Sequence, residues 1–145
     1  MNRTRNCWAS MLYRQKGRGD HFKYKNIEIQ QSWFTFENFL ADMGERPEGK
    51  SLDRIDNNKG YSKDNCRWAT PAEQVQNRGP LMSKRKTSKY KGVYWRKDED
   101  RWVARICFNK KEICLGRFKS EEQAAAAYNK AAIEYFGEFS CLNKL

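Results

Sequence analysis

Long apolar runs are absent from this sequence. In its 145 residues no stretch approaches the roughly 18 consecutive apolar residues that a membrane-spanning helix requires. The first residues, Met1 to Arg5, are not followed by the apolar segment of a secretory signal peptide. We therefore expect no membrane anchor and no signal peptide, and we expect the protein in the cytoplasm.

Metal-binding and disulfide patterns are also missing. The chain has one histidine, His21, and five dispersed cysteines without a C-x-x-C pair: Cys7, Cys66, Cys107, Cys114 and Cys141. Structural zinc sites and disulfide frameworks need paired spacings or even numbers. The sequence predicts neither, which agrees with a reducing compartment.

Positive charge is abundant. There are 29 Lys and Arg against 18 Asp and Glu, a net charge of +11. Up to Gly79 the chain carries 14 basic and 10 acidic residues, and after it 15 and 8. A basic chain rich in aromatic residues suits a polyanion. We expect a nucleic acid partner rather than a membrane or a small-molecule substrate.

A break in composition follows Gly79. Residues 80–89 are polar and basic with little apolar content, which is typical of a tether between folded units. The sequence therefore predicts an α+β protein of two domains, 1–79 and 90–145, joined by a linker at 80–89. Lys84, Arg85 and Lys86 in this linker are candidate contacts to phosphates.

The segment after the linker alternates in polarity. Apolar residues recur at every second position over 93–96, 102–108 and 113–115, which predicts three antiparallel strands. Ser120 is a typical N-cap for an alanine-rich helix that ends near Gly137. We expect the helix to cover one side of the sheet.

The uncovered side of this sheet is basic and aromatic. Alternation places Tyr94, Arg96, Arg105 and Lys91 on it. A major groove roughly 12 Å wide admits such a ribbon, where arginine reads guanine edges and lysine neutralises phosphates. Double-stranded DNA is therefore the expected partner.

The same residues resemble the Apetala-two/ethylene-response-factor (ERF) DNA-binding domain over about 55 residues. The resemblance implies a sheet that lies in the DNA major groove. The matching motifs are Tyr90-Lys91-Gly92-Val93, Trp102-Val103-Ala104-Arg105-Ile106, Leu115-Gly116-Arg117-Phe118, Glu122-Gln123-Ala124-Ala125-Ala126-Ala127-Tyr128 and Phe136-Gly137-Glu138-Phe139.

Three positions depart from that family. Tyr94 stands where members usually have Arg, and Glu112 and Cys114 stand on the third strand where Arg and Trp are common. The expected fold therefore carries over, but the recognised base sequence does not.

The first 79 residues carry a second pattern. Trp8, Met11 and Leu12 at helical spacing predict one helix, and an aromatic-rich segment at 33–43 predicts another. Residues 51–74 then read as strand, loop, strand and helix, with Thr70 at the helix N-cap.

This strand-loop-strand-helix pattern resembles the ββα unit of HNH, or His-Me finger, endonucleases, in particular phage-type proteins that pair it with an ERF-like domain. The resemblance implies Asp53 as a ligand of Mg²⁺ or Mn²⁺ and Asn65 as the loop residue that orients the first strand. Gln74 or Asn77 would complete the metal site. An alternative for Asp53 is a salt bridge with Arg54 or Arg67, and for Gln74 and Asn77 an ordinary helix surface.

The general base is the weak point of that resemblance. Arg54 stands where these enzymes have a histidine, and arginine cannot accept a proton from water. It can stabilise developing negative charge. His21, folded back, and Asp56 are the alternative bases, while Asp56 also suits a plain turn residue.

Two functions follow from the pattern. The first is a homing-type, metal-dependent HNH endonuclease of a phage or mobile element, acting in a bacterial or phage-infected cell. The second is a non-catalytic duplex-DNA binder, a regulator or an occluding factor, which the Arg54 substitution favours. A weaker alternative is an RNA binder or a protein-directed inhibitor. The pattern predicts no oligomeric state.

Overall fold

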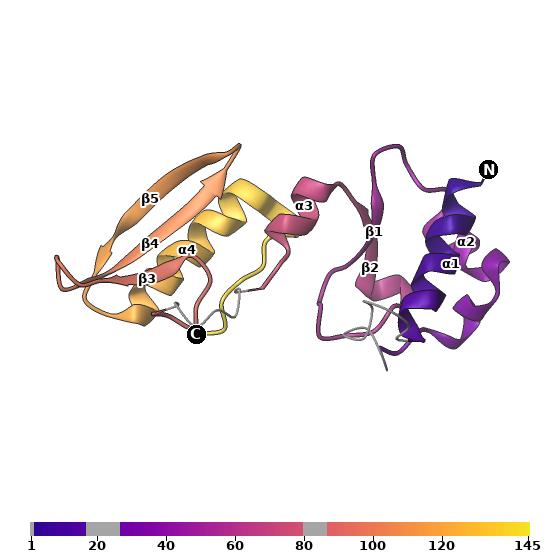
Figure 1. Ribbon diagram of the computed structural model, residues 1–145, viewed down its shortest axis with the longest axis horizontal. Coiled ribbons are helices and arrows are strands. Elements are labelled where there is room, and N and C mark those ends of the chain that lie inside the picture. The colour runs from indigo at the N-terminus through magenta and orange to yellow at the C-terminus, as the bar shows by residue number, and fades with distance from the viewer. Residues whose placement is uncertain (1, 17–26, 80–86) are drawn as a thin grey trace. The chain divides into compact units, whose positions relative to one another are not determined.

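The computed structural model describes residues 2–16, 27–79 and 87–145, so His21, Lys84, Arg85 and Lys86 lie outside the described residues (Figure 1). The chain divides into two compact units, Met1–Gln74 and Val75–Leu145. This division comes five residues before the boundary at Gly79 that composition suggests. The two units are described separately below.

The first unit begins with two helical segments. Helix α1 (Arg3–Gln15) starts at Asn2, whose side chain accepts the N–H groups of Thr4 and Arg5. The expected helix at 33–43 is divided into a 3₁₀ turn, η2 (Gln31–Phe34), and helix α2 (Phe36–Met43). The division falls at Thr35, whose backbone is extended, with φ −101° and ψ 128°.

A hairpin and a short helix follow. Strands β1 (Ser51–Arg54) and β2 (Cys66–Ala69) pair antiparallel, with the 3₁₀ turn η3 (Lys63–Asn65) between them and α3 (Pro71–Gln76) after them. The predicted capping residue is confirmed. The Thr70 N–H donates to Glu73 Oε2 at 2.7 Å, and the Glu73 N–H donates back to Thr70 Oγ1 at 3.3 Å.

The core of the first unit is aromatic. Trp33 and Phe39 are fully buried and meet edge to face at 5.0 Å. The indole N–H of Trp8 donates to the main-chain carbonyl of Trp33 at 2.7 Å. The indole N–H of Trp68 donates to the main-chain carbonyl of Met43, also at 2.7 Å. These bonds fix α1, α2 and the hairpin around one cluster.

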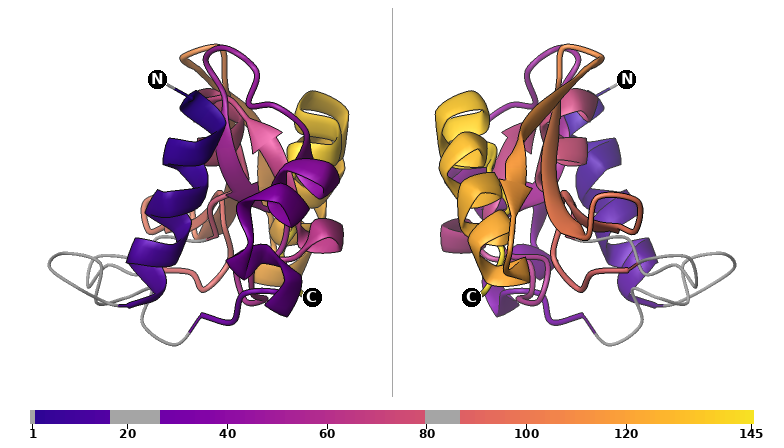
Figure 2. Two further views of the ribbon diagram at one scale, coloured as in Figure 1. Left: turned by 90° about the vertical axis from the view of Figure 1, so that its right-hand side faces the viewer. Right: turned by 90° about the vertical axis from the view of Figure 1, so that its left-hand side faces the viewer.

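The second unit is the predicted three-stranded sheet with one helix. Strands β3 (Val93–Arg96), β4 (Arg101–Phe108) and β5 (Lys111–Phe118) lie antiparallel in that order, and α4 (Glu121–Phe136) runs along one face before the turn η4 (Gly137–Phe139) (Figures 1 and 2). The third strand is longer than the expected 113–115. The predicted cap is confirmed, because Ser120 Oγ accepts the N–H of Gln123 at 3.2 Å.

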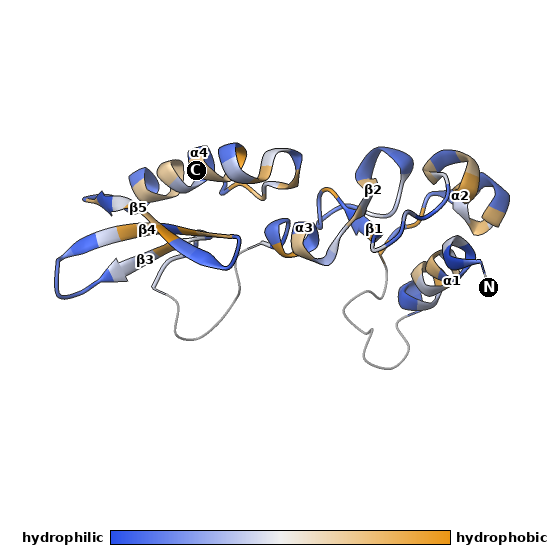
Figure 3. Cartoon of the chain, turned by 90° about the horizontal axis from the view of Figure 1, so that it is seen from above, coloured by the Kyte–Doolittle hydropathy of each residue, from blue (hydrophilic) through white to orange (hydrophobic). Residues whose placement is uncertain are grey.

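Small residues bring the helix close to the sheet. Figure 3 shows α4 beside the three strands. Its buried positions toward the sheet are mostly alanine: Ala124, Ala125, Ala131 and Ala132. Gly92, with φ +72°, lies so close to this helix that an added Cβ would stand 2.1 Å from the Tyr128 ring. Among the described residues of this unit, no helix or strand covers the opposite face of the sheet.

Candidate functional site

The strand register defines one exposed side of the three-stranded sheet, which we call the outer face. Val93, Ala104 and Trp102 point toward α4, so their strand neighbours point away from it. The outer face comprises Tyr94, Arg96, Arg101, Val103, Arg105, Cys107, Glu112, Cys114 and Arg117. Three of the four predicted DNA-binding residues of this unit, Tyr94, Arg96 and Arg105, therefore lie together.

Lys91 has a different place. It precedes β3, and its ammonium group donates to the main-chain carbonyl of Gln76. Its main chain is held by Asn143, which accepts the Lys91 N–H and donates to the Lys91 carbonyl. Lys91 is thus at the end of the sheet rather than within the outer face.

Carboxylates of the turn between β3 and β4 hold two of the outer-face arginines. Arg96 Nε lies 3.2 Å from both carboxylate oxygens of Asp98, and Arg96 Nη1 lies 3.2 Å from Glu99. Glu99 also accepts from Arg117. The hydrogen bond to Asp98 raises the pKa of Arg96, and the same bond lowers the pKa of Asp98. Both guanidinium groups therefore have carboxylate partners within this unit.

Arg105 has a separate partner. Its Nη1 lies 2.9 Å from Oε1 and 3.0 Å from Oε2 of Glu112 on β5, and its guanidinium lies over the Tyr94 ring at 4.7 Å. Val103 is only 2% exposed although it belongs to neither core cluster beneath the sheet. Its cross-strand neighbours are Tyr94 and Arg117, so long side chains of the outer face cover it.

Sequence reasoning missed two arginines of this face. Arg101 and Arg117 pair in register with Arg96 and Val103. Alternation along β4 points to Arg101. Arg117 requires knowledge of the register shift at Ala104/Arg105, which the sequence does not display.

In the first unit, the hairpin positions Asp53. Asp53 lies opposite Arg67, and its Oδ2 is 3.4 Å from Arg67 Nε, with both side chains largely buried. The salt-bridge alternative for Asp53 thus exists in the structure. Gln74 lies toward the same strand, where its amide donates to Ser51 Oγ at 2.7 Å.

Asn65 locks the loop that precedes the second strand. Its side-chain oxygen accepts the Asp56 N–H at 2.9 Å, and its amide donates to the carbonyls of Asp56 and Gly60 at 3.1 and 2.8 Å. Asp56 in turn accepts from the main chain and side chain of Asn58. Asn65 is buried, so these bonds hold the loop against the end of β1.

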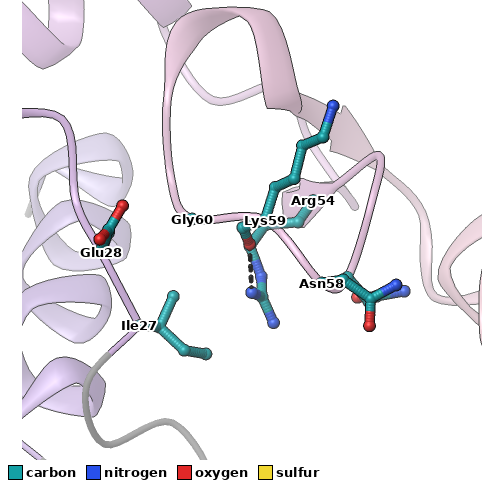
Figure 4. Close-up of a pocket in the computed structure, with 7 residues that line it drawn as sticks. Ile27, Glu28, Arg54, Asn58, Lys59 and Gly60 are labelled. Atoms are coloured by element: carbon teal, nitrogen blue, oxygen red, sulfur yellow. Dashed lines mark hydrogen bonds between the residues drawn. The ribbon is translucent and has the colours of Figure 1, made fainter.

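Arg54 projects away from Asp53. Alternation along β1 places the two side chains on opposite faces, and Arg54 lies over the Tyr61 ring at 5.1 Å. Its Nη1 donates to the Lys59 carbonyl at 2.6 Å (Figure 4). It lines a cavity of about 500 Å³ together with Ile27, Glu28, Asn57, Asn58, Lys59 and Gly60.

The donor chemistry of the hairpin fits a hard divalent cation only in part. Mg²⁺ is commonly bound through one or two carboxylates, with water and substrate phosphates completing its shell. Asp53 provides a carboxylate, and Gln74 an amide oxygen. The remaining candidate, Asn77, is buried and belongs to the second unit. Within the described residues no group of three or more His, Cys, Asp and Glu side chains is arranged to hold a metal.

The cysteines give no site of their own. Burial raises the pKa of the Cys66 thiol to about 12, which leaves it protonated and unreactive near neutral pH. Across the described ranges, no helix combines the length and apolar character needed to cross a membrane.

Comparison with known proteins identifies the second unit. The AP2 domain family matches residues 88–138, and members of that family bind double-stranded DNA. The chain is 46% identical over 61 residues to the ethylene-responsive transcription factor WRI1 of Arabidopsis thaliana, which covers 41% of this chain and 14% of that protein. It is 47% identical over 55 residues to the AP2-like ethylene-responsive transcription factor At1g16060 of the same plant, covering 37% and 16%.

One relative extends over both units. The uncharacterized HNH endonuclease L560 of Acanthamoeba polyphaga mimivirus is 32% identical over 103 residues, 70% of this chain and 51% of that protein. Neither unit is long enough to contain 103 residues, so the alignment includes parts of both. The chain thus spans at most about half the length of these relatives, and no solved structure matches it. Residues 88–138 of this chain form an AP2 domain.

Proposed function

We propose that this protein is a metal-dependent DNA endonuclease of the HNH type, which binds duplex DNA with the outer face of its AP2 domain. The observation that carries the proposal is the similarity to a protein named as an HNH endonuclease, which runs through both units. The hairpin supports it, because β1 carries the Asp53 carboxylate and Asn65 holds the loop at the end of that strand.

In this proposal Asp53 and Gln74 would hold the cation, Mg²⁺ or Mn²⁺, through a carboxylate and an amide oxygen. A bound divalent cation would supply charge for the phosphoryl oxygens and lower the pKa of a water. Arg67 lies against Asp53, with its Nε 3.4 Å from Asp53 Oδ2, and pairs with the carboxylate that would face the cation. Asn65 holds the loop at the end of β1 and so positions the strand that carries Asp53.

Arg54 has a different role from the histidine that it replaces. An arginine side chain does not serve as a general base, and Arg54 lies on the face opposite Asp53, so we assign it to a DNA phosphate rather than to proton transfer. The Asp56 carboxylate accepts two hydrogen bonds from Asn58 in the turn, so we do not assign it as the general base. That His21 acts as the general base stays a prediction from the sequence.

The experiment is cleavage of supercoiled plasmid with Mg²⁺ or Mn²⁺ by wild type, Asp53→Asn and Asp64→Asn. Asp64 is an exposed acid of the same unit, so the second variant is matched in charge. We expect nicking that Asp53→Asn abolishes and Asp64→Asn retains, with equal DNA affinity for all three. Cleavage by Asp53→Asn at the wild-type rate would contradict the assignment.

A second function is favoured by one specific observation, the ion pair between Asp53 and Arg67. If this pair is purely structural, the protein is a non-catalytic duplex-DNA binder that regulates or occludes its site. Salt-sensitive binding without cleavage under any divalent cation would establish that function instead.

A further inference from the structure

We propose that Arg105 and Glu112 form one reading unit that selects a G·C base pair, with Arg105 on guanine and Glu112 on cytosine. The inference rests on the proposed duplex-DNA binding by the outer face, and it adds which residues choose the base. In this inference Glu112 helps to determine the base sequence that is bound, although it is an acidic residue on a basic surface.

The first argument is the order of donors and acceptors. In the major groove a G·C pair presents N7 and O6 of guanine as acceptors, followed by the N4 amino group of cytosine as a donor. Arg105 presents donors, and Glu112 presents acceptors beside them at 2.9–3.0 Å. The protein pair therefore complements the edge of the base pair, group by group.

An A·T pair does not offer this match. Its edge presents N7 as acceptor, N6 as donor and O4 of thymine as acceptor. The N6 donor would meet an arginine donor, and O4 would meet the carboxylate. Both groups would then be desolvated without a partner, which is how hydrogen-bonding sites reject a wrong ligand.

The second argument is the fixed position of the arginine. The Arg105 guanidinium is held between Glu112 and the Tyr94 ring, at 4.7 Å from its centroid. Both contacts to Glu112 use Nη1, so the ion pair does not occupy Nη2 or Nε. A fork that is already oriented loses less conformational entropy when it binds a base edge.

The third argument is that the side chains beside the pair are short. Arg105 stands opposite Cys114, and Cys107 stands opposite Glu112. The four positions form a square in which the two charged side chains occupy one diagonal and two short thiols the other. Side-chain exposure of 48% for Arg105 and 60% for Glu112 agrees with a pair that projects from the sheet.

A contribution to folding stability does not explain why this ion pair is present. An exposed ion pair of this kind contributes little to folding. A carboxylate on a DNA-facing surface also repels phosphates, so by charge alone Glu112 weakens binding. Only a G·C pair places two acceptors for Arg105 beside a donor for Glu112, so cytosine N4 is the base group that Glu112 suits.

The test is selection of bound duplexes from a randomised pool by the full chain, comparing wild type, Glu112→Gln, Glu134→Gln and the double swap Arg105→Glu with Glu112→Arg. Glu134 is exposed on α4, so its variant is a control for charge. Wild type and Glu134→Gln should share one strongly preferred G·C pair. Glu112→Gln should weaken that preference about 5- to 150-fold while leaving other positions unchanged.

The double swap retains the ion pair and reverses the order of donor and acceptor. We expect it to prefer C·G at the same position. Tighter binding of Glu112→Gln to all sequences, with unchanged base preferences, would overturn the inference and leave DNA binding intact. Absence of any duplex binding by wild type would instead reject the proposed function itself.

Discussion

The side chain of Asn143 forms two hydrogen bonds with the main chain of Lys91. The Lys91 N–H donates to Asn143 Oδ1 at 2.6 Å, and Asn143 Nδ2 donates to the Lys91 carbonyl at 3.1 Å. Asn129 on α4 binds the main chain of Asn143 in the same two-way manner, at 2.7 and 2.9 Å. The C-terminal segment thus connects the start of β3 to the helix.

We predict that Asn143→Ala destabilises the second unit by about 1–3 kcal/mol, because it leaves main-chain groups of Lys91 without these bonds. Urea unfolding followed by circular dichroism measures the change. Lys144→Ala, at the exposed next residue, should shift the midpoint little. Equal midpoints for Asn143→Ala and wild type would show that the two bonds contribute nothing.

Gly92→Ala should prevent the second unit from folding. The new methyl group would lie 2.1 Å from Tyr128 Cδ2 and 2.6 Å from the Arg105 carbonyl oxygen, and the carbonyl belongs to a central strand. Gly137→Ala is the matched control, because Gly137 also has positive φ, +52°, but nothing lies within 4 Å of an added Cβ. We expect Gly137→Ala to cost roughly 1–3 kcal/mol, the backbone strain alone at φ 52° and ψ −126°. A folded Gly92→Ala of similar stability would contradict the close packing.

Asn65→Ala should destabilise the first unit by roughly 2–4 kcal/mol, since the buried Asn65 side chain loses three hydrogen bonds to Asp56 and Gly60. Asn58→Ala, at an exposed position of the same loop, should cost at most about 1 kcal/mol. Hydrogen exchange of the Asp56 amide reports directly on the loop. Unchanged protection in Asn65→Ala would contradict the role assigned to this side chain.

The stability of the first unit should fall at acid pH through Asp42. The indole N–H of buried Trp33 donates to Asp42 Oδ2 at 2.8 Å, and this bond, followed by Lys63, lowers the pKa of Asp42 below its ordinary 3.8. A carboxyl whose pKa is lower in the folded state stabilises the fold above pH 3.8 and loses that contribution as pH falls through the folded value. Asp42→Asn should be less stable at neutral pH and should lack this acid-dependent part in fluorescence-monitored denaturation. The same pH profile in both proteins would assign the acid transition to other groups.

The parts of the fold that the sequence predicted correctly are those set by patterns among neighbouring residues. Strand alternation, the Ser120 and Thr70 caps and the small residues of α4 act within a few residues, so the order of three strands and a helix was correct. Thr35 divides the helix expected at 33–43 because its backbone is extended, and Trp33 before it and Phe36 after it both enter the same core cluster. The hydrogen bonds between Lys91 and Asn143 join residues 52 positions apart, so no pattern among neighbouring residues could predict them.

The candidate site shows the same distinction. The exposed side of β3 and β4 followed from alternation, whereas the ion pair of Arg105 with Glu112 depends on the register shift beside Ala104. Asp53 was expected either on a metal or in a salt bridge, and only the register that sets it opposite Arg67 shows the latter contact. Metal binding by Asp53, Gln74 and Asn77 stays a prediction.

Arg96 and the linker cations should differ in how they respond to salt and sequence. Arg96 is oriented by Asp98 and Glu99, so much of its charge is already compensated within the protein. If it reads a base, Arg96→Ala relaxes preference at one position by roughly 1–3 kcal/mol and barely changes the salt dependence. Replacing Lys84, Arg85 and Lys86 by Ala should instead weaken binding to all sequences. If all three contact phosphates, the slope of log K against log salt concentration becomes shallower by about 2.7, at roughly 0.9 per contact. A uniform loss of affinity in Arg96→Ala, with a shallower slope, would assign Arg96 to the DNA backbone and leave base reading to the pair of Arg105 and Glu112.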